Sequence, residues 1–215
     1  MEDWSKICYS DASTFQLQTS TIPKLWNKIS SPSPIRPTLK HPTKFMVWSV
    51  MSVKGAGRLH VVEGNIKTDQ YVHVLTTWLL PQVRDWFPEG NYSFMQDGAP
   101  CHTSKKSMEW LRQNRIPVFD WPGNSPDCNS IDTLWAIIKR RIPTQTHTTQ
   151  QELISAIIKA WMKDASVPET CKRLVARMPD RIRADIRAKD GHMKYLPLRT
   201  FFYFLFVCFL FLAAH

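Results

Sequence analysis

Three aspartates in separate segments constrain the fold of this chain more than any other feature. Asp11 stands in Cys-Tyr-Ser-Asp-Ala-Ser, Asp97 in Phe-Met-Gln-Asp-Gly-Ala-Pro-Cys-His, and Asp132 in Ser-Pro-Asp-Cys-Asn-Ser-Ile-Asp-Thr-Leu-Trp. The last two are separated by 34 intervening residues. Carboxylates that a fold brings together without basic partners repel one another, and a divalent cation commonly relieves that repulsion. If the three segments meet, they predict a metal site.

The first third of the chain predicts strands. Residues 6–17 alternate apolar and polar side chains, which indicates a strand with Asp11 near its middle or end. Residues 45–53 and 58–63 are β-rich, and the glycine-bearing residues 54–57 between them predict a hairpin turn. Residues 18–44 hold five prolines among Ser, Thr and Lys, which disfavours regular structure over most of this insert.

The middle of the chain alternates strands and helices. Thr68 opens a helical pattern with apolar positions at Val72, Leu75, Leu79 and Val83, and Pro81 either ends or kinks that helix. Residues 92–95 predict a short strand that carries Asp97 at its C-terminal end, and Thr103 begins another helix. Residues 116–121 predict a strand, 122–130 a loop and 131–142 a helix that carries Asp132. This order indicates the α/β class.

Residues 148–195 predict a basic helical part. Thr149 with Glu152, and Ser166 with Glu169, match the capping-box pattern. Apolar stripes at helix spacing predict core faces at Leu153, Ile157 and Trp161, and at Leu174, Val175 and Met178.

The chain is basic, with a formal net charge of +10 and a pI near 9.5. Such a balance suits a partner made of phosphates, although charge that merely keeps the protein soluble explains it equally well. Between Lys172 and Lys194 eight Lys or Arg face three Asp, so this stretch either lies along a phosphate backbone or forms a solvated helical face. The candidate nucleic-acid-binding residues are Lys139, Arg140, Arg141, Lys172, Arg173 and Arg177.

The five cysteines are scattered and form no Cys-x-x-Cys pair, which indicates a reducing compartment and no zinc site. The polar N-terminus lacks a secretory signal, which favours the cytosol or nucleus. Residues 196–215 form an apolar tail outside the domain of residues 1–195. The 14 uncharged residues from Phe201 to Ala214 would span about 21 Å as a helix, short of the roughly 30 Å of a bilayer core. The tail is therefore either a membrane anchor or appended sequence.

The aspartates suit the cleavage and rejoining of phosphodiesters. Both reactions need an activated nucleophile and charge relief at the leaving oxygen, which two Mg²⁺ or Mn²⁺ ions held by carboxylates supply. Each aspartate alone could instead be structural: Asp97 before glycine as a turn residue, Asp132 as a helix N-terminal acid and Asp11 as a local cap. His102 could orient a metal-bound water, touch the scissile phosphate or cap the helix that follows.

The segments Gln96-Asp-Gly-Ala-Pro-Cys-His102 and Trp121-Pro-Gly-Asn-Ser-Pro-Asp-Cys-Asn-Ser-Ile-Asp-Thr-Leu-Trp135 resemble the catalytic domain of Tc1/mariner DDE transposases. The likeness extends from about residue 4 to residue 195. It implies an RNase H-like mixed sheet flanked by helices, two Mg²⁺ or Mn²⁺ ions, and DNA strand cleavage with transfer of the 3′ end. It also implies that Asp11, Asp97 and Asp132 are the metal-binding catalytic acids.

The sequence departs from the family pattern in three respects. Asp132 stands where this branch usually has glutamate, and Ala12 stands where glutamate is usual beside the first acid. The helix-turn-helix region that precedes the family's catalytic domain has no counterpart here, so we expect recognition of transposon ends to be lost. The alternative function is therefore an inactive, nucleic-acid-binding remnant of a transposable element. The nucleus is the expected location, or a membrane if the tail inserts, and a homodimer is one possible assembly.

Overall fold

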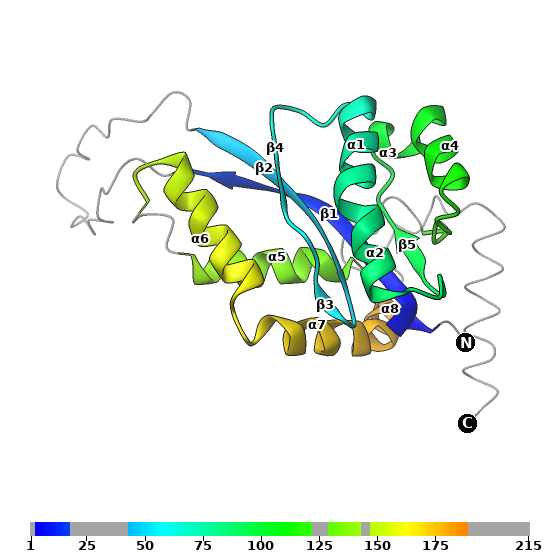
Figure 1. Ribbon diagram of the computed structural model, residues 1–215. Helices are drawn as coiled ribbons and strands as arrows, with labels where there is room; N and C mark the ends of the chain where they lie inside the picture. The colour runs from blue at the N-terminus through cyan, green and yellow to red at the C-terminus, as the bar shows by residue number, and fades with distance from the viewer. Residues whose placement is uncertain (1–2, 18–42, 122–128, 143–146, 189–215) are drawn as a thin grey trace.

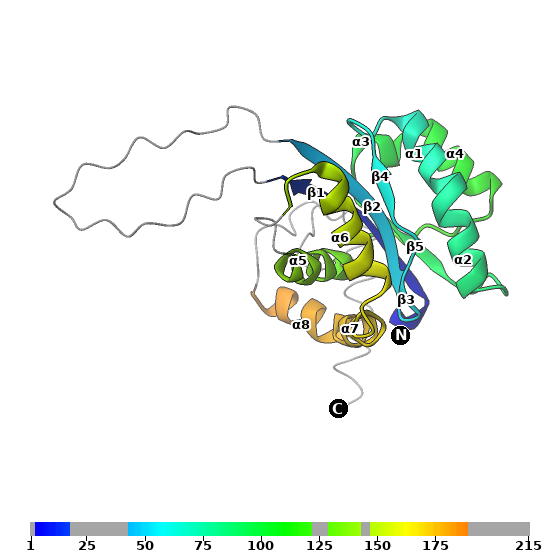
Figure 2. The ribbon, with the colours of Figure 1, turned by 60° about the vertical axis from the view of Figure 1, so that its left-hand side comes forward.

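The computed structural model describes residues 3–17, 43–121, 129–142 and 147–188, and these form a three-layer α/β/α arrangement. A mixed sheet stands between two groups of helices, with α1 to α4 on one side and α5 to α8 on the other (Figures 1 and 2). The chain enters through a 3-10 turn, η1 (Trp4–Lys6), that leads directly into the central strand. The predicted α/β class with flanking helices is thus confirmed.

Five strands form the sheet: β1 (Ile7–Gln16), β2 (Lys44–Ser52), β3 (Gly55–Ala56), β4 (His60–Val62) and β5 (Ser93–Met95). β1 pairs antiparallel with β2 on one side and parallel with β5 on the other. The strand predicted over residues 6–17 is therefore central. Because β1 and β5 run in the same direction, the residues that follow Met95 lie beside the middle of β1, close to Asp11.

The predicted hairpin forms, but its second run is split. The turn is shorter than predicted, since Gly55 already pairs with Ser52. Ala56 pairs with Met51 and His60 with Trp48, so the three residues from Gly57 to Leu59 stand opposite two residues of β2. Such an extra residue is a β-bulge. Its backbone is satisfied partly by β2 itself, where the amide of Gly57 donates to the carbonyl of Val50 at 2.7 Å, and partly by side chains: the hydroxyl of Ser49 donates to the carbonyl of Arg58 at 2.9 Å.

The helix predicted from Thr68 runs on to Trp86, so Pro81 does not end it. It consists of α1 (Thr68–Val74), a π-helical segment η2 (Leu75–Leu79) and α2 (Leu80–Trp86). The amide of Leu80 donates to the carbonyl of Leu75, five residues back, directly before the proline that has no N–H to donate. The buried face of this helix differs from the predicted one at its start, where Tyr71 and Val74 are buried and Val72 is only half-buried.

Two expectations for residues 100–121 were wrong in detail. The helix expected from Thr103 is divided into α3 (Pro100–Thr103) and α4 (Lys105–Gln113), because Ser104 takes the extended N-cap conformation and accepts the Ser107 amide at 3.2 Å. The strand expected over residues 116–121 is reduced to one parallel bridge between Val118 and Phe94. A single bridge leaves this outer segment too short to count as a strand.

Four helices cover the opposite face: α5 (Ser130–Arg141), α6 (Gln150–Met162), α7 (Val167–Ala176) and α8 (Met178–Ala188). The capping box of Thr149 and Glu152 is confirmed at the start of α6. The one expected at Ser166 was wrong, because its hydroxyl donates to Asp164 at 2.7 Å and accepts from Arg141 at 2.9 Å.

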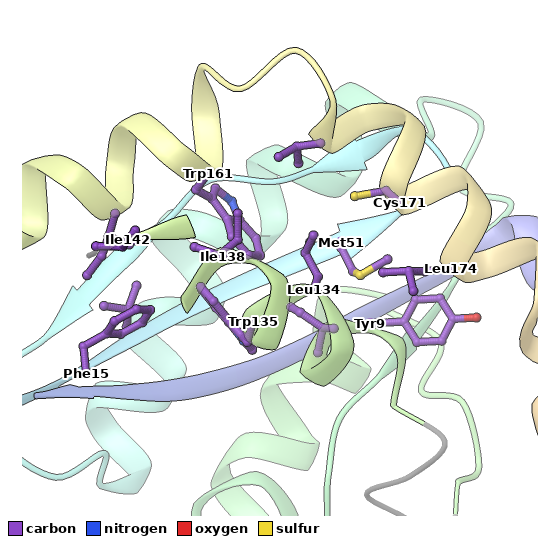
Figure 3. Packing of buried hydrophobic residues seen from close by; sticks show 14 of the residues in the cluster. Tyr9, Phe15, Met51, Leu134, Trp135, Ile138, Ile142, Trp161, Cys171 and Leu174 are labelled. Carbon is purple, nitrogen blue, oxygen red and sulfur yellow. The ribbon is translucent and has the colours of Figure 1, made fainter. Parts of the chain in front are cut away.

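The sheet separates two hydrophobic cores. Alternate residues of β1 enter opposite cores: Ile7, Tyr9 and Phe15 face α5 to α8, and Cys8 faces α1 and α2. On the α5 side both predicted apolar stripes are buried. Figure 3 shows one residue of each stripe, Trp161 and Leu174, within that core. Trp135 of α5 stacks on Trp161 of α6 with ring centroids 4.2 Å apart, and this pair fills the centre of that core.

Several sequence expectations fall outside the described residues. These are most of the proline-rich insert, residues 122–128 of the loop before α5, and the apolar tail from residue 196. Within the described ranges, none of the helices has the length and apolar character needed to cross a bilayer. Cys8, Cys101 and Cys171, which are the described cysteines, are free thiols.

Gly57 is the position in the bulge where we expect a side chain to be least tolerated. A Cβ added there would lie 2.7 Å from Cγ1 and 2.8 Å from the carbonyl oxygen of Val50, and 3.0 Å from the ring of Trp86. Gly57→Ala should therefore lower the free energy of unfolding in urea by about 1–3 kcal/mol through overpacking.

Gly64→Ala is the matched control, because Gly64 has a φ of +69° and nothing within 4 Å of its added Cβ. It should cost only the backbone strain, about 1 kcal/mol or less. A free energy of unfolding for Gly57→Ala that is no lower than that of the natural protein would show that the close contacts at Gly57 relax without cost.

Candidate active site

Asp11 lies on β1 and its side chain faces α5. Asp11 has the same parity along β1 as Tyr9 and Phe15, which belong to the core on the α5 side. The helix α5 contacts β1 directly. A carboxyl group near the middle of β1, on a face that it shares with Ser13 and with buried apolar side chains, is therefore presented to the helix that carries the third aspartate.

Asp132 lies in the first turn of α5 and meets Asp11 there. The two carboxyl groups lie close enough to interact directly, and each shifts the pKa of the other. Burial, and then the negative charge of Asp132, raise the pKa of Asp11 to about 8. Burial also raises the pKa of Asp132, and the charge of Asp97 acts in the same direction. The two groups therefore titrate as a pair in an environment that disfavours two negative charges.

Asp97 follows β5 and is held in place by two donors. Its Oδ1 accepts a hydrogen bond from the amide of Ala99 at 3.0 Å and a short one from Nδ1 of His102. The bond from His102, with a further contribution from Ala99, lowers the pKa of Asp97, although partial burial opposes this. Asp97 is thus an ionised carboxylate, and its charge acts on both Asp11 and Asp132.

The three aspartates predicted from the sequence therefore interact electrostatically at one end of the β1–β5 pair. Their donor chemistry fits a divalent ion, since they offer hard carboxylate oxygens at a place where burial, and then the charge of Asp132, raise the pKa of Asp11. As the side chains stand, no three His, Cys, Asp or Glu of the described ranges form a group close enough to enclose an ion. Their role as metal ligands stays a prediction.

Two cationic side chains flank the acids. Lys139, on α5, lies with Nζ 5.2 Å from the centre of the Phe15 ring. Partial burial lowers the pKa of Lys139, although the charges of Asp11 and Asp132 oppose this. Arg181, on α8, donates from Nη1 to the hydroxyl of Thr133 at 3.2 Å, and its charge favours the ionised form of Asp132. The pKa of Asp11 stays raised despite these two positive charges.

The other candidate nucleic-acid-binding residues lie along α5 and α7. Arg140 is exposed, and its Nε donates to the carbonyl of Ala136 at 3.2 Å. Arg141 forms an ion pair with Asp164 that connects α5 to the start of α7. The remaining three, Lys172, Arg173 and Arg177, are exposed, and Lys172 lies 3.8 Å from Glu169. Contact of these residues with nucleic acid stays a prediction.

Sequence reasoning missed three residues that shape the site. Tyr71 is fully buried and donates to Oε1 of Gln96 at 2.6 Å, and Gln96 donates to the carbonyl of His102 at 3.3 Å. The sequence signal for Tyr71 was its place on the apolar face of a predicted helix, because a tyrosine hydroxyl that is buried there requires a hydrogen-bond partner. Arg181 gave no distinguishing signal among the many basic residues of its segment.

Replacing Asp11 by asparagine should stabilise the protein in the absence of metal ions at neutral pH. The pKa of Asp11 is about 8 in the folded chain, whereas an unfolded aspartate titrates near pH 4. Between these values the unfolded state loses its proton first, so the stability contributed by Asp11 falls as the pH rises from about 4 to about 8.

Asp11→Asn removes the contribution of this carboxyl group to the pH dependence. In urea with a chelator it should exceed the natural protein in free energy of unfolding by on the order of 2 kcal/mol at pH 7 and by little near pH 4. Asp69→Asn, at an exposed aspartate paired with Lys106, is the control and should show no comparable gain at pH 7. A difference between Asp11→Asn and the natural protein that does not grow with pH would contradict the proposed burial of charge.

Comparisons with known proteins agree with the resemblance found in the sequence. The profile of the DDE superfamily endonuclease family matches residues 6–154. The Transposable element Tcb1 transposase of Caenorhabditis briggsae is 30% identical over 90% of this chain and 71% of its own length. The Transposable element Tc3 transposase of Caenorhabditis elegans is 28% identical over 90% of this chain and 59% of its own length.

Solved structures of the Mos1 mariner transposase share the fold. A paired end complex with Mn superposes with a TM-score of 0.73 at 18% identity, covering 91% of this chain and 58% of that chain. A Mos1 catalytic domain with Raltegravir and Mg covers 91% of this chain and 87% of that one, with a TM-score of 0.68. The chain thus spans little more than half of the longer Mos1 structures and most of the isolated catalytic domain. It has the RNase H-like fold and belongs to the DDE endonuclease superfamily, as a catalytic domain of the Tc1/mariner transposases.

Proposed function

We propose that this chain cleaves DNA strands and joins the released 3′ ends to new DNA, with Asp11, Asp97 and Asp132 as ligands of divalent metal ions. The single observation that carries the proposal is the mutual interaction of these three carboxyl groups, which come from a strand, a loop and a helix. A protein without a use for them would gain stability by replacing at least the buried one with an uncharged residue.

Mg²⁺ or Mn²⁺ bound there would activate the attacking hydroxyl or water and neutralise the leaving oxygen. The chain's own part is to hold the oxygen ligands rigidly. Asp11 is fixed by the central strand, Asp132 by the first turn of α5, and Asp97 by its bonds to Ala99 and His102. Ligands on three separate elements can bind ions from several sides, as octahedral coordination requires.

The shorter third acid is compatible with this role. Asp132 already reaches the carboxyl of Asp11, so the missing methylene relative to glutamate does not prevent the two groups from meeting. The Mos1 structures that were solved with Mn and with Mg support the choice of ion, because they share this chain's fold.

DNA is the proposed partner. The chain carries a net charge of +10, and the acidic site is bordered by Lys139, which lies beside Asp11 and Asp132. A phosphate backbone that passes the metal ions could extend over Lys139 and then meet the exposed cations of α7. The Mos1 complexes with transposon ends support DNA as the substrate class of this fold.

The test is the cleavage of supercoiled plasmid by the full 215-residue chain in the presence of Mn²⁺. Asp97→Asn should reduce nicking by at least about 100-fold and weaken Mn²⁺ binding in calorimetry, because one ligand of the ions is lost. Asp85→Asn removes an exposed carboxylate that pairs with Arg58 away from the site, and it should change neither.

Two outcomes would reject the catalytic proposal. Equal nicking by the natural protein and Asp97→Asn would identify a contaminating nuclease. A folded protein that binds DNA without measurable Mn²⁺ affinity would identify the inactive remnant instead.

The salt dependence of DNA binding tests the path of the phosphate backbone. Replacing Lys172 and Arg173 by alanine should reduce the slope of log K against log salt concentration by about 1–2, since each lost phosphate contact contributes about 0.9. The control is the double variant Lys105→Ala with Arg112→Ala, which removes the same charge from α4 on the opposite face (Figure 2). Equal changes in both double variants would mean that only net charge matters and that α7 has no specific contact.

A further inference from the structure

The side chain of Asp97 lies outside any regular element, so its orientation must be set by contacts rather than by the backbone of a helix or strand. β5 ends at Met95, two residues earlier, and α3 begins three residues later at Pro100. The two described hydrogen bonds, from Ala99 and from His102, both end on Oδ1. They fix the rotation of the carboxylate and use one of its two oxygens, which leaves Oδ2 as the oxygen that neither bond engages.

His102 is itself held from two sides. Its residue is 7% exposed, and its ring lies over the ring of Tyr71 with centroids 4.1 Å apart and planes inclined by 35°. Its carbonyl accepts a hydrogen bond from Nε2 of Gln96 at 3.3 Å. Because a ring contact and a main-chain contact act together, the imidazole has little freedom to turn away from Asp97.

Tyr71 and Gln96 complete the arrangement. The Tyr71 hydroxyl donates to Oε1 of Gln96 at 2.6 Å, so the amide of Gln96 must direct Nε2 toward His102. Tyr71 is 0% exposed and belongs to α1, while Gln96 is 7% exposed and directly precedes Asp97. A helix on one face of the sheet is thereby connected through buried hydrogen bonds to a carboxylate at the acidic site.

We propose that His102, locked by Tyr71 and Gln96, is a positioning residue that aims the Asp97 carboxylate at the metal ions. The proposal rests on the proposed function, because it assigns His102 to a ligand of that site. An ionised carboxylate has no proton to give, so the imidazole nitrogen that faces it, Nδ1, carries the hydrogen of this bond. Of the earlier alternatives for His102, this geometry favours neither a helix cap nor direct contact with a phosphate.

The competing explanation is that His102 only fills space between α3 and α1. The two explanations make opposite predictions for two substitutions. His102→Phe keeps an aromatic ring for Tyr71 to pack against but has no donor for Asp97. His102→Asn loses the ring but places an amide N–H close to the position of Nδ1. Space filling requires the ring, whereas positioning requires the donor.

The experiment is Mn²⁺ binding to the full chain by calorimetry at a single pH, with thermal unfolding of each metal-free variant as the check on folding. We expect His102→Phe to bind Mn²⁺ about 10-fold or more weakly, and His102→Asn to remain within about 3-fold of the natural protein. Tyr71→Phe, which removes only the hydroxyl bonded to Gln96, should weaken binding by about 3-fold. Tyr92→Phe, at a half-buried tyrosine that packs on Phe87, is the matched control and should bind normally.

Unchanged Mn²⁺ affinity in His102→Phe, or a greater loss in His102→Asn than in His102→Phe, would overturn the positioning role alone. Absence of Mn²⁺ binding by the natural protein would overturn the proposed function and this inference together. If His102→Phe does not fold, Tyr71→Phe decides the question, and normal affinity in that variant counts against the proposal.

A second measurement needs neither metal nor activity. Nitrogen NMR of the metal-free natural protein should show His102 with its hydrogen on Nδ1, and Tyr71→Phe should broaden or shift that signal as the ring becomes freer. A hydrogen on Nε2 with Nδ1 bare would contradict the bond to Asp97 on which the inference depends.

Discussion

The contact between the middle of β1 and the first turn of α5 is the interaction on which the rest of this structure depends. It places Asp11 against Asp132 at the margin of an apolar core, to which Tyr9 and Phe15 of the strand and Trp135 of the helix belong. Burying two carboxyl groups together costs free energy unless they are protonated or bound to a cation. The apolar packing around the two carboxyl groups must offset that cost. The same packing holds the strand and the helix that carry them in fixed positions.

The packing that offsets this cost comes from the C-terminal helices. Phe15 of β1 packs edge-to-face on Trp135, with ring centroids 6.0 Å apart, and Trp135 stacks on Trp161 of α6. Trp161 in turn donates from Nε1 to the carbonyl of Gly57 at 2.8 Å, in the bulge of the sheet. A chain of contacts thus runs from the strand of the first acid through the helix of the third acid to the far edge of the sheet (Figure 3). The helices α6 and α7 hold α5 in the one orientation that brings Asp132 to Asp11.

The sequence predicts best those elements in which the local residue pattern and the tertiary packing favour the same structure. The central strand alternates because its two faces enter two different cores, and α6 combines a capping box with an apolar stripe that is buried along its length. The interaction of Asp11, Asp97 and Asp132 was also foreseeable, since their flanking motifs match a family. A local pattern does not reveal the hydrogen-bond partner of a polar side chain. The pattern at Ser166 predicts a helix cap, but its hydroxyl bonds to Arg141 and Asp164 instead.

Other differences arise where tertiary contacts override local preference. The run after the hairpin turn is β-rich, yet a bulge divides it because Ser49, Gln82 and Trp161 bind its backbone from outside the ladder. Pro81 predicts a break, and a single π-helical turn before it keeps the helix continuous so that Leu79 and Val83 remain buried on one face. Residues 116–121 are rich enough in apolar side chains for a strand, but only Val118 has a partner position on β5.

The positions of the two flanking cations follow from the same constraint that places the acids. A cation in direct contact with Asp11 would lower its pKa but would also occupy oxygens that a metal ion needs. Lys139 instead has its ammonium over the Phe15 ring, where a cation–π contact holds the charge while its field still reaches Asp11 and Asp132. Arg181 acts on Asp132 from α8, with one guanidinium nitrogen on the neighbouring Thr133. Both charges are thereby near enough to attract a polyanion toward the acids, while burial and the neighbouring aspartates still keep the pKa of Asp11 raised.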